Sequence, residues 1–519
     1  MANYEPQFIK ANEKGRPLKR DNNWMDISRF IDGTSVYYGR MTEDGVCRRC
    51  VNIRCDGDVL TRRRGRTLFG DGGDAGQVYM SAVLQKLDAD DIQFRLVDGG
   101  SAGVQLQKYD SGWEDVGDNI GDADDRVDWF WVSINIGGED RLYFTNGVSD
   151  IHYTNGTTIS TVSGVKAKYI TKIGSQLVIG HPTSVWSPDI ILYAKGNSHQ
   201  FYSDTDSGYS TSTNYFSLDG EVSQVIGFNG LIYGFTPSDG LFEIDLIDKT
   251  SRKVSTSGTL APKSVTDDWD MVAWFNQDGI WGMTAGNSPV LISTKVNKLL
   301  QQLAYENIKQ VVCGFNVHGQ LEVHLGDISF EGIDYPNYTL LYEVEQSRLE
   351  DNNIWREDSG KMFPNNMVNW TNEYGFTQTY YGSRYTQSTW LNDYGYEDDT
   401  DTPIEIVWES KDFKLVRPNQ EAIINDVYID YEPAGAIDLP LSVYISVDGD
   451  DWLLLQTAAL ESSGNAIGLI HVPTVKDLIG RTVAIKLVSE DDAALSVYGI
   501  HISYSYNNTD IKLSNEYSE

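Results

Sequence analysis

The stretch Asn229-Gly230-Leu231-Ile232-Tyr233-Gly234-Phe235-Thr236-Pro237-Ser238-Asp239-Gly240 is the best guide to the fold class of this chain. Its centre is a short run of aliphatic and aromatic residues, which favour strands. An X-Gly pair stands on either side of that run, and such pairs supply the positive φ angles that two-residue hairpin turns need. The stretch therefore predicts short antiparallel strands joined by tight turns.

The same theme recurs along the chain and predicts a β-propeller. It returns at 140–159, 165–180 with 189–195, 222–248, 270–292, and 310–325 with 338–344. The starts lie about 40–50 residues apart, which is the spacing of one four-stranded blade. At that period, residues 71–400 would hold about six to eight blades. The composition agrees with an all-β fold, since 30 Tyr and 13 Trp accompany 48 Gly and only 14 Pro.

One segment of this region is predicted to be a helix. After Ser293, apolar residues recur at i, i+3, i+4, i+7 and i+8, which predicts a single helix with one apolar face. We expect it to decorate the propeller rim or to cross between two blades.

The chain changes character near residue 400. An acidic connection at 393–403 precedes alternating runs of apolar and polar residues, and this pattern over about six to eight strands predicts a β-sandwich at 401–519. Within it, an S-x-D-G-x-x-W hairpin signature consists of Ser446, Asp448, Gly449 and Trp452. The Asp and Gly make the turn and the Trp covers the edge of the core, so we interpret the set as a structural turn. The same signature occurs in carbohydrate-binding sandwiches, so a sugar-binding role stays open.

Charge is distributed unevenly along the chain. Residues 1–70 hold 14 Lys and Arg against 9 Asp and Glu, a surplus of five, so the remainder must carry −39 to give the net charge of −34. A body this acidic repels nucleic acid and anionic membranes. Residues 1–70 are therefore predicted to be a basic docking segment for an acidic partner. The candidate docking residues are Arg48, Arg49, Arg54, Arg62, Arg63, Arg64 and Arg66.

The cysteines and acidic clusters suggest packing and solvated loops rather than metal sites. Cys47, Cys50 and Cys55 lack a nearby histidine as a fourth zinc ligand, and on a strand Cys47 and Cys50 would face opposite sides. Together with Cys313 they read as packed thiols. The aspartates at 118–128 do not follow the order of a calcium-binding loop. We expect no metal and no cofactor.

Nothing in the sequence marks a catalytic centre or a membrane anchor. The phosphate-binding loop and the G-x-S-x-G nucleophile motif are both missing from the sequence. With 75 acidic residues, carboxylate pairs of the glycosidase type arise by chance. We expect a protein that is not an enzyme. No apolar run is long enough to span a membrane, and the start at Met1 lacks the features of a secretory signal, which predicts synthesis in the cytoplasm of the producing cell.

Three stretches together resemble a family of bacteriophage tail proteins. The first is 45–65, which is similar to the N-terminal segment of proteins that close the portal channel. The second is the expected helix at 293–305 followed by 316–323. The third is 339–344 leading to Ile354-Trp355-Arg356-Glu357. The last two resemble the blades of hub or nozzle proteins of short-tailed phages, also called packaged-DNA stabilisation proteins. Arg64 stands where the family has proline, and Glu343 stands where it has aspartate.

This resemblance implies a structural virion protein of the tail, made in the host cytoplasm. Such a protein forms an oligomeric ring, of six-fold order, below the portal-adaptor (head-to-tail connector) proteins. It contacts tail fibre or needle proteins, retains packaged DNA and lets DNA pass without specific binding during ejection. Two alternatives stay open at this point: a carbohydrate- or receptor-binding virion protein, and a propeller glycosidase.

Overall fold

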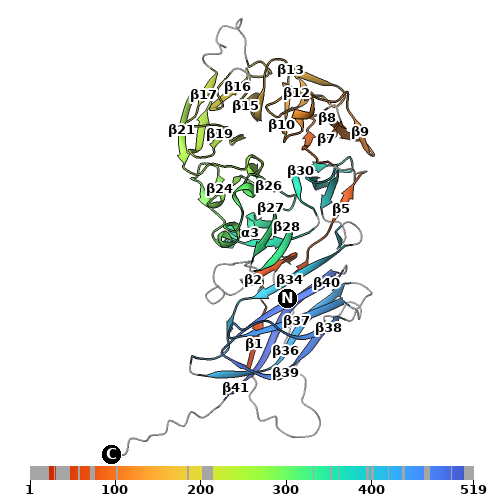
Figure 1. Ribbon diagram of the computed structural model, residues 1–519, viewed down its shortest axis with the longest axis vertical. Coiled ribbons are helices and arrows are strands. Elements are labelled where there is room, and N and C mark those ends of the chain that lie inside the picture. Colours follow the sequence, from red (N-terminus) through yellow and green to blue (C-terminus); the bar gives the residue numbers. More distant parts are fainter. Residues whose placement is uncertain are drawn as a thin grey trace, which may run out of the picture.

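The computed structural model describes residues 23–28, 30, 47–56, 59–70, 76–100, 103–183, 186–201, 214–330, 332–350, 353–360, 362–392, 397–398, 402–418, 420–434, 439–460, 468–491 and 494–507. Nearly all regular structure in these residues is β-strand. Figure 1 shows a β-propeller at the top of the view and a unit of two β-sheets at the bottom. The prediction of an all-β fold with a propeller is confirmed.

Seven four-stranded units, each one blade, form the described propeller ring. Six are separate antiparallel sheets and one, β26–β29, belongs to a larger sheet. The first blade consists of β6 (Met80–Leu84), β7 (Ile92–Asp98), β8 (Val104–Tyr109) and β9 (Trp113–Asp115). The second consists of β10 (Phe130–Ile136), β11 (Glu139–Thr145), β12 (Ile151–Thr154) and β13 (Ile159–Val162). The third consists of β14 (Ala167–Ile173), β15 (Gln176–Pro182), β16 (Ile190–Tyr193) and β17 (Tyr215–Ser217). The fourth blade consists of β18 (Gln224–Phe228), β19 (Leu231–Thr236), β20 (Gly240–Asp245) and β21 (Thr250–Ser255). The fifth consists of β22 (Thr266–Asp268), β23 (Met271–Asn276), β24 (Gly279–Thr284) and β25 (Val290–Leu291). The sixth consists of β26 (Val312–Phe315), β27 (Gln320–Phe330), β28 (Ile333–Glu343) and β29 (Trp355–Asp358). The last combines β30 (Pro364–Thr371), β31 (Thr377–Ser383) and β32 (Thr389–Asn392) with β5 (Arg66–Phe69).

The turns follow the predicted chemistry. Asn229 and Gly230 connect β18 to β19 with φ angles of 48° and 80°. Two consecutive positive φ angles are what a type I′ hairpin turn requires, and its twist matches the twist of the strands it joins. The blades therefore arise from local sequence, one meander after another.

The propeller ring is closed by a strand from the other end of the sequence. β5 pairs with β32 in antiparallel register, with Thr389 opposite Phe69 and Asn392 opposite Arg66. One blade is thus assembled from strands more than 290 residues apart. This closure joins the first and the last part of the propeller by backbone hydrogen bonds.

The expected helix after Ser293 is instead two single-turn helices, α1 (Asn297–Leu300) and α2 (Tyr305–Ile308). Ala304 is extended, with ψ of 144°, and this separates them. The pair crosses from β25 to β26, as predicted. Val296, Leu299 and Leu300 are buried in a hydrophobic core that the blades β22–β25 and β26–β29 share. A third helix, α3 (Val344–Glu350), follows β28 and was not predicted.

The lower unit in Figure 1 consists of two sheets that bury one hydrophobic core. One sheet has the order β3-β4-β41-β36-β39, with β1 also paired to β41. Its strands are β1 (Asn23–Ile27), β3 (Ile53–Asp56), β4 (Val59–Arg62), β36 (Glu421–Ala434), β39 (Gly468–Gly480) and β41 (Ala494–Asn507). The other contains β2 (Cys47–Val51), β33 (Glu397–Asp398), β34 (Thr402–Ser410), β35 (Phe413–Lys414), β37 (Leu439–Val447), β38 (Leu453–Leu460) and β40 (Thr482–Asp491).

The second of these sheets is continuous with the propeller. β2 pairs with β34 on one side and with β29 of the propeller on the other, so blade β26–β29 and the lower unit share one eleven-stranded sheet. The described part of residues 1–70 is accordingly not a separate docking unit. Its strands are divided among both lower sheets and the closing blade.

Candidate functional site

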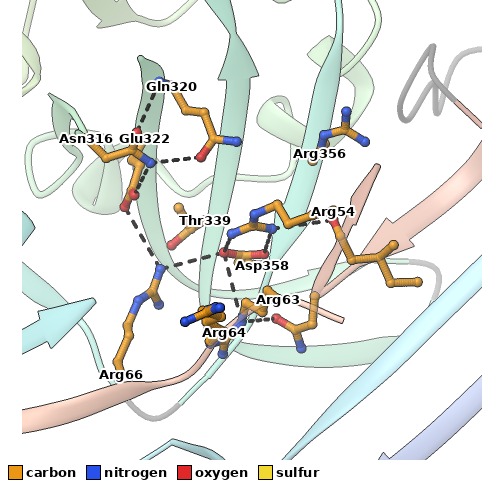
Figure 2. A network of polar contacts seen from close by, with 12 residues as sticks. Arg54, Arg63, Arg64, Arg66, Asn316, Gln320, Glu322, Thr339, Arg356 and Asp358 are labelled. Carbon is orange, nitrogen blue, oxygen red and sulfur yellow. Dashed lines mark hydrogen bonds and ion pairs between the residues drawn. The ribbon is translucent and has the colours of Figure 1, made fainter. Parts of the chain in front are cut away.

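Residues 47–70, which we call the arginine strap, run between the propeller and the lower unit. The strap contributes β2, β3, β4 and β5. Four of its arginines point toward carboxylates on β27, β29 and β33, namely Arg49, Arg54, Arg63 and Arg66. Figure 2 shows this polar network, with Asp358 near its centre. We call the arginines and their partner carboxylates the arginine junction.

Asp358 on β29 is fully buried and faces three arginines of the strap. Arg54 donates two hydrogen bonds to it, from Nη1 to Oδ1 and from Nη2 to Oδ2, both at 2.8 Å. Nη2 of Arg66 and Nε of Arg63 lie 3.6 and 4.0 Å from Oδ2. A bidentate arginine–carboxylate pair has a narrow range of allowed geometries, so it fixes β3 relative to β29.

Arg63 is held by a second carboxylate and by a strained asparagine. Its side chain is 1% exposed and donates from Nη1 and Nη2 to Asp398 on β33, at 3.0 and 2.7 Å. Its Nε donates to Oδ1 of Asn52 at 2.8 Å. Asn52 is buried with φ of 57°, a conformation that asparagine tolerates better than most residues, and its Nδ2 donates to the carbonyl of Glu405.

Glu357, next to Asp358, binds Arg49 of the strap. Arg49 Nε and Nη2 lie 2.8 and 2.6 Å from Oε2 of Glu357, which also accepts a hydrogen bond from the Tyr338 hydroxyl. Burial by itself lowers the pKa of Arg49, but Glu357 outweighs this and raises it. Burial and the same carboxylate raise the pKa of Tyr338. The guanidinium also lies 4.5 Å from the centre of the Tyr335 ring.

Glu322 on β27 joins the closing blade to the junction. It accepts hydrogen bonds from the Tyr381 hydroxyl and from Asn316 Nδ2, and it lies 3.2 Å from His324 and 3.9 Å from Arg66. Burial favours the neutral acid, but His324, Arg66 and Asn316 outweigh it and lower the pKa of Glu322 to about 2. Burial also lowers the pKa of His324.

We predicted that seven arginines form a surface for docking an acidic partner. These contacts show that most of them are instead buried inside the protein. Arg49, Arg62, Arg63 and Arg66 are at most 5% exposed. Arg62 donates to Ser489 on β40, and Arg54 is half-buried against Asp358. Arg48 is also half-buried, and Arg64 alone of the seven is exposed. The physical reason is that carboxylates from distant strands neutralise four of these side chains in the interior, those of Arg49, Arg54, Arg63 and Arg66.

The predicted turn residues lie between β37 and β38. Asp448 and Gly449 have φ of 55° and 83°, and Ser446 Oγ donates to the Asp450 carbonyl at 2.6 Å. Oδ1 of Asp448 accepts from the backbone N–H groups of Arg481 and Thr482 at 2.8 and 2.9 Å. Trp452 is half-buried under Lys486, whose Nζ lies 5.9 Å from the ring. These side chains hold the hairpin against β40.

The cysteines are buried within the described residues. A register shift between Cys47 and Arg49 places Cys47 and Cys50 in the same hydrophobic core, so the prediction that they face opposite sides is wrong. Cys313 packs in the core of blade β26–β29, and the side chain of Cys55 lies outside the described residues. In the described part of the chain no three His, Cys, Asp or Glu side chains gather as metal ligands. Likewise, no described helix has the length and apolar character to cross a membrane.

The aspartates at 118–128 form structural contacts. Asp125 is 2% exposed and accepts hydrogen bonds from Asn146, Ser149 and the backbone of Asp122. It therefore ties the loop before β10 to the turn after β11. Asp128 pairs with Lys263 at 3.0 Å.

A cavity of about 700 Å³ lies where the innermost strands of the blades meet. Strands β6, β10, β14, β18, β22, β26 and β30 all contribute to its lining. Its charged residues include Lys172, whose Nζ donates to the Ser133 carbonyl at 2.7 Å, and Asp267. Burial and the neighbouring Asp268 raise the pKa of Asp267 to about 6.

Comparison with known proteins finds low similarity. No family model matches the chain, and no curated protein matches it. Among solved structures, the extracellular domain assigned to a one-component system of B. thetaiotaomicron aligns with 76% of this chain at 13% identity and a TM-score of 0.36. The chain spans about half of that domain, 47% of its length. BBS1N, solved in complex with ARL6DN, aligns with 64% of this chain and 97% of its own length at 10% identity and a TM-score of 0.38.

The junction residues that sequence reasoning missed are the carboxylates and Asn52. Glu322, Glu357, Asp358 and Asp398 lie about 260 to 335 positions from the arginines they contact. No local motif links such partners. The one local signal is that Glu357 and Asp358 stand in a short strand after the buried Trp355 and Arg356. The fold and this junction are compatible with a binding or structural role.

Proposed function

We propose that this protein is a structural component of a bacteriophage tail, a hub or nozzle subunit below the portal-adaptor that helps to retain packaged DNA. The observation that carries the proposal is the arginine junction, which joins the propeller to the lower unit through buried ion pairs and one continuous sheet. A subunit of a channel under internal pressure needs this kind of stiff connection. The proposal includes no catalytic step.

The junction supports a rigid connection because its energy depends on geometry. A buried charge is costly unless a partner meets it at the right distance and angle. Any hinge motion between β29 and the strap would separate Asp358 from Arg54, which are now bonded twice at 2.8 Å. The relative orientation of the propeller and the lower unit is therefore strongly favoured over its alternatives.

The charge of the chain supports the DNA-retaining part of the proposal. The net charge is −34, and much of the positive charge of the strap is neutralised in the interior. A surface of this kind repels DNA phosphates, so DNA would slide past without specific binding. The same repulsion acts between copies of the chain, so we propose that the six-fold ring forms on a portal-adaptor template and not spontaneously.

Microscopy of defined mixtures tests this function. We expect the purified chain to be monomeric and to form rings in negative-stain images only when the portal-adaptor complex of the same phage is added. Mass photometry gives the number of chains bound. The proposal fails if the chain does not bind the portal-adaptor, and the templating argument fails if the chain forms stable rings alone at low salt.

A second candidate function is receptor or carbohydrate binding, and one observation favours it. Tyr374 and Phe376, in the turn between β30 and β31, are 76% and 67% exposed. Exposed aromatic rings in one turn can stack on sugar rings. Saturable binding to a glycan array that is lost in Tyr374→Ala and Phe376→Ala would support this candidate, and an empty array would eliminate it.

A further inference from the structure

A small cationic pocket lies beside the central cavity of the propeller. Its volume is about 410 Å³, and the cavity and the pocket share Lys263. The charged residues that line the pocket are Lys263 after β21, Lys309 after α2, Arg384 after β31, and Asp128 before β10. Three cations and one carboxylate thus face one opening, in a chain whose net charge is −34.

The single carboxylate is already engaged. Nζ of Lys263 lies 3.0 Å from Oδ1 of Asp128, and the same carboxylate oxygen accepts from Asn365 Nδ2 at 3.1 Å. Lys263 also donates to Oδ1 of Asn365. The Lys263 side chain is 11% exposed, so it lies mostly in the protein interior and not on the surface.

Arg384 has only neutral partners. Its Nη1 donates to the side chain of Gln310, and its Nη2 donates to the Gln310 carbonyl at 3.1 Å and to Oδ1 of Asn365 at 3.3 Å. Among the described residues, no carboxylate lies within ion-pair distance of Arg384 or Lys309. One amide oxygen therefore receives hydrogen bonds from two cations, Lys263 and Arg384.

This arrangement is electrostatically unfavourable when the pocket is empty of anions. Burial is the main cause that lowers the pKa of Lys263 to about 8; Asp128 opposes this effect and Arg384 adds to it. Burial also lowers the pKa of Arg384, although Asp128 acts in the opposite direction. Both shifts mean that the charged forms lack sufficient compensation, and a bound anion would supply it.

We propose that this pocket is a binding site for a small oxyanion, a phosphate or a carboxylate group. Gln310 and Asn365 occupy three of the five N–H donors of Arg384, so its other N–H groups can donate to such a group, while Lys263 and Lys309 add point charges. The pocket volume is ample for an ion of this size. The site stands on its own residues and does not depend on the virion role proposed above.

Calorimetric titration of the full-length chain tests the site and distinguishes the two sources of the oxyanion. Inorganic phosphate and glutarate are titrated separately at pH 7 and low ionic strength. We expect saturable binding of at least one of them at one site per chain. Phosphate binding alone assigns a phosphate group, glutarate binding alone assigns a carboxylate, and binding of both assigns a general oxyanion site.

Matched variants locate the binding. We expect Arg384→Gln and the exposed Lys309→Gln each to weaken binding at least tenfold. Arg252→Gln is the control, because Arg252 is an exposed arginine paired with Glu243 on a different blade, and it should bind as the wild type does. Circular dichroism confirms that each variant is folded. The proposal is overturned if neither anion gives saturable binding, or if Lys309→Gln and Arg384→Gln bind as tightly as the control.

Discussion

The arginine junction and the core of the lower unit are both buried, yet the junction consists of charged and polar side chains and the core of apolar ones. The core between the two lower sheets is almost wholly apolar, with residues such as Leu441, Val443, Ile485 and Leu487. The junction holds arginines, carboxylates, a histidine and an asparagine at similar depth. The two regions even share one sheet, since β2 joins β29 to β34 and β40.

The difference shows how stability and orientation are supplied separately. Apolar burial is non-directional and contributes roughly in proportion to area, so a core of aliphatic side chains tolerates small shifts. Buried ion pairs contribute little net stability compared with apolar residues of the same size, but they penalise displacement steeply. The lower unit is therefore stabilised by its apolar core, and its position on the propeller is set by the charged junction.

The largest loss of stability is expected when Arg63 is replaced and its exposed neighbour Arg64 is kept as the comparison. Arg63→Met removes the buried partner of Asp398 and should lower the free energy of unfolding by about 3–5 kcal/mol. Arg64→Met is the matched control, because Arg64 is exposed, and it should change stability by no more than about 0.5 kcal/mol. Urea denaturation measures both. Equal effects of the two substitutions would contradict the buried role of Arg63.

A substitution in the apolar core tests the other region. Leu441→Ala removes a fully buried side chain and should cost about 2–5 kcal/mol through lost burial and a residual cavity. In contrast to Arg63→Met, it should leave the orientation of the two units unchanged. Small-angle X-ray scattering of the folded variant checks this, since an altered or broadened distance distribution would break the distinction between the regions.

Acid should weaken the junction and spare the apolar core. The pKa of Glu322 is lowered to about 2 in the folded protein, so its stabilising contribution is complete above the unfolded pKa of about 4.5 and is lost as the pH falls toward 2. Glu322→Gln should therefore be less stable than the wild type by about 3 kcal/mol at pH 7. That difference should shrink toward zero at pH 2. Unfolding free energies measured from pH 7 to pH 2 decide it, and a constant difference would refute the charged state of Glu322.

The smallest effect concerns a polar contact at the edge of the apolar unit. Asp448→Ala removes the acceptor for two backbone N–H groups at the start of β40 and should cost about 1–2 kcal/mol. Asp448→Asn keeps an acceptor oxygen and tolerates the positive φ, so it should lose less. Thermal unfolding ranks the two variants. The reverse ranking would show that an acceptor oxygen at position 448 does not stabilise the turn.

The local features of the fold could be predicted from sequence, and the long-range ones could not. Pairs such as Asn229-Gly230 encode a hairpin in adjacent residues, so the blade period was visible along the chain. The pairing of β5 with β32 has no such local signal, because its strands are joined only in the folded protein. The single helix predicted after Ser293 was too long, because apolar spacing alone does not reveal the extended Ala304.

The arginine strap shows the same limit for the site. A run such as Arg62-Arg63-Arg64 resembles a solvated basic surface when it is considered alone. Arg62 and Arg63 are buried against Ser489 and Asp398, which lie 427 and 335 residues away from them. The surplus of positive charge in residues 1–70 predicts an acidic partner, and for Arg49, Arg54, Arg63 and Arg66 that partner lies in the same chain.

The central claim is that the propeller and the lower unit form one rigid body, and an interspin distance tests it most directly. Spin labels attached through p-acetylphenylalanine at Ile247, exposed after β20, and at Leu469, exposed on β39, report on the two units without disturbing the buried cysteines. Double electron–electron resonance of the full-length chain should give one narrow distance distribution, and Arg63→Met should broaden it. A broad or two-peaked distribution in the wild-type background would contradict the claim.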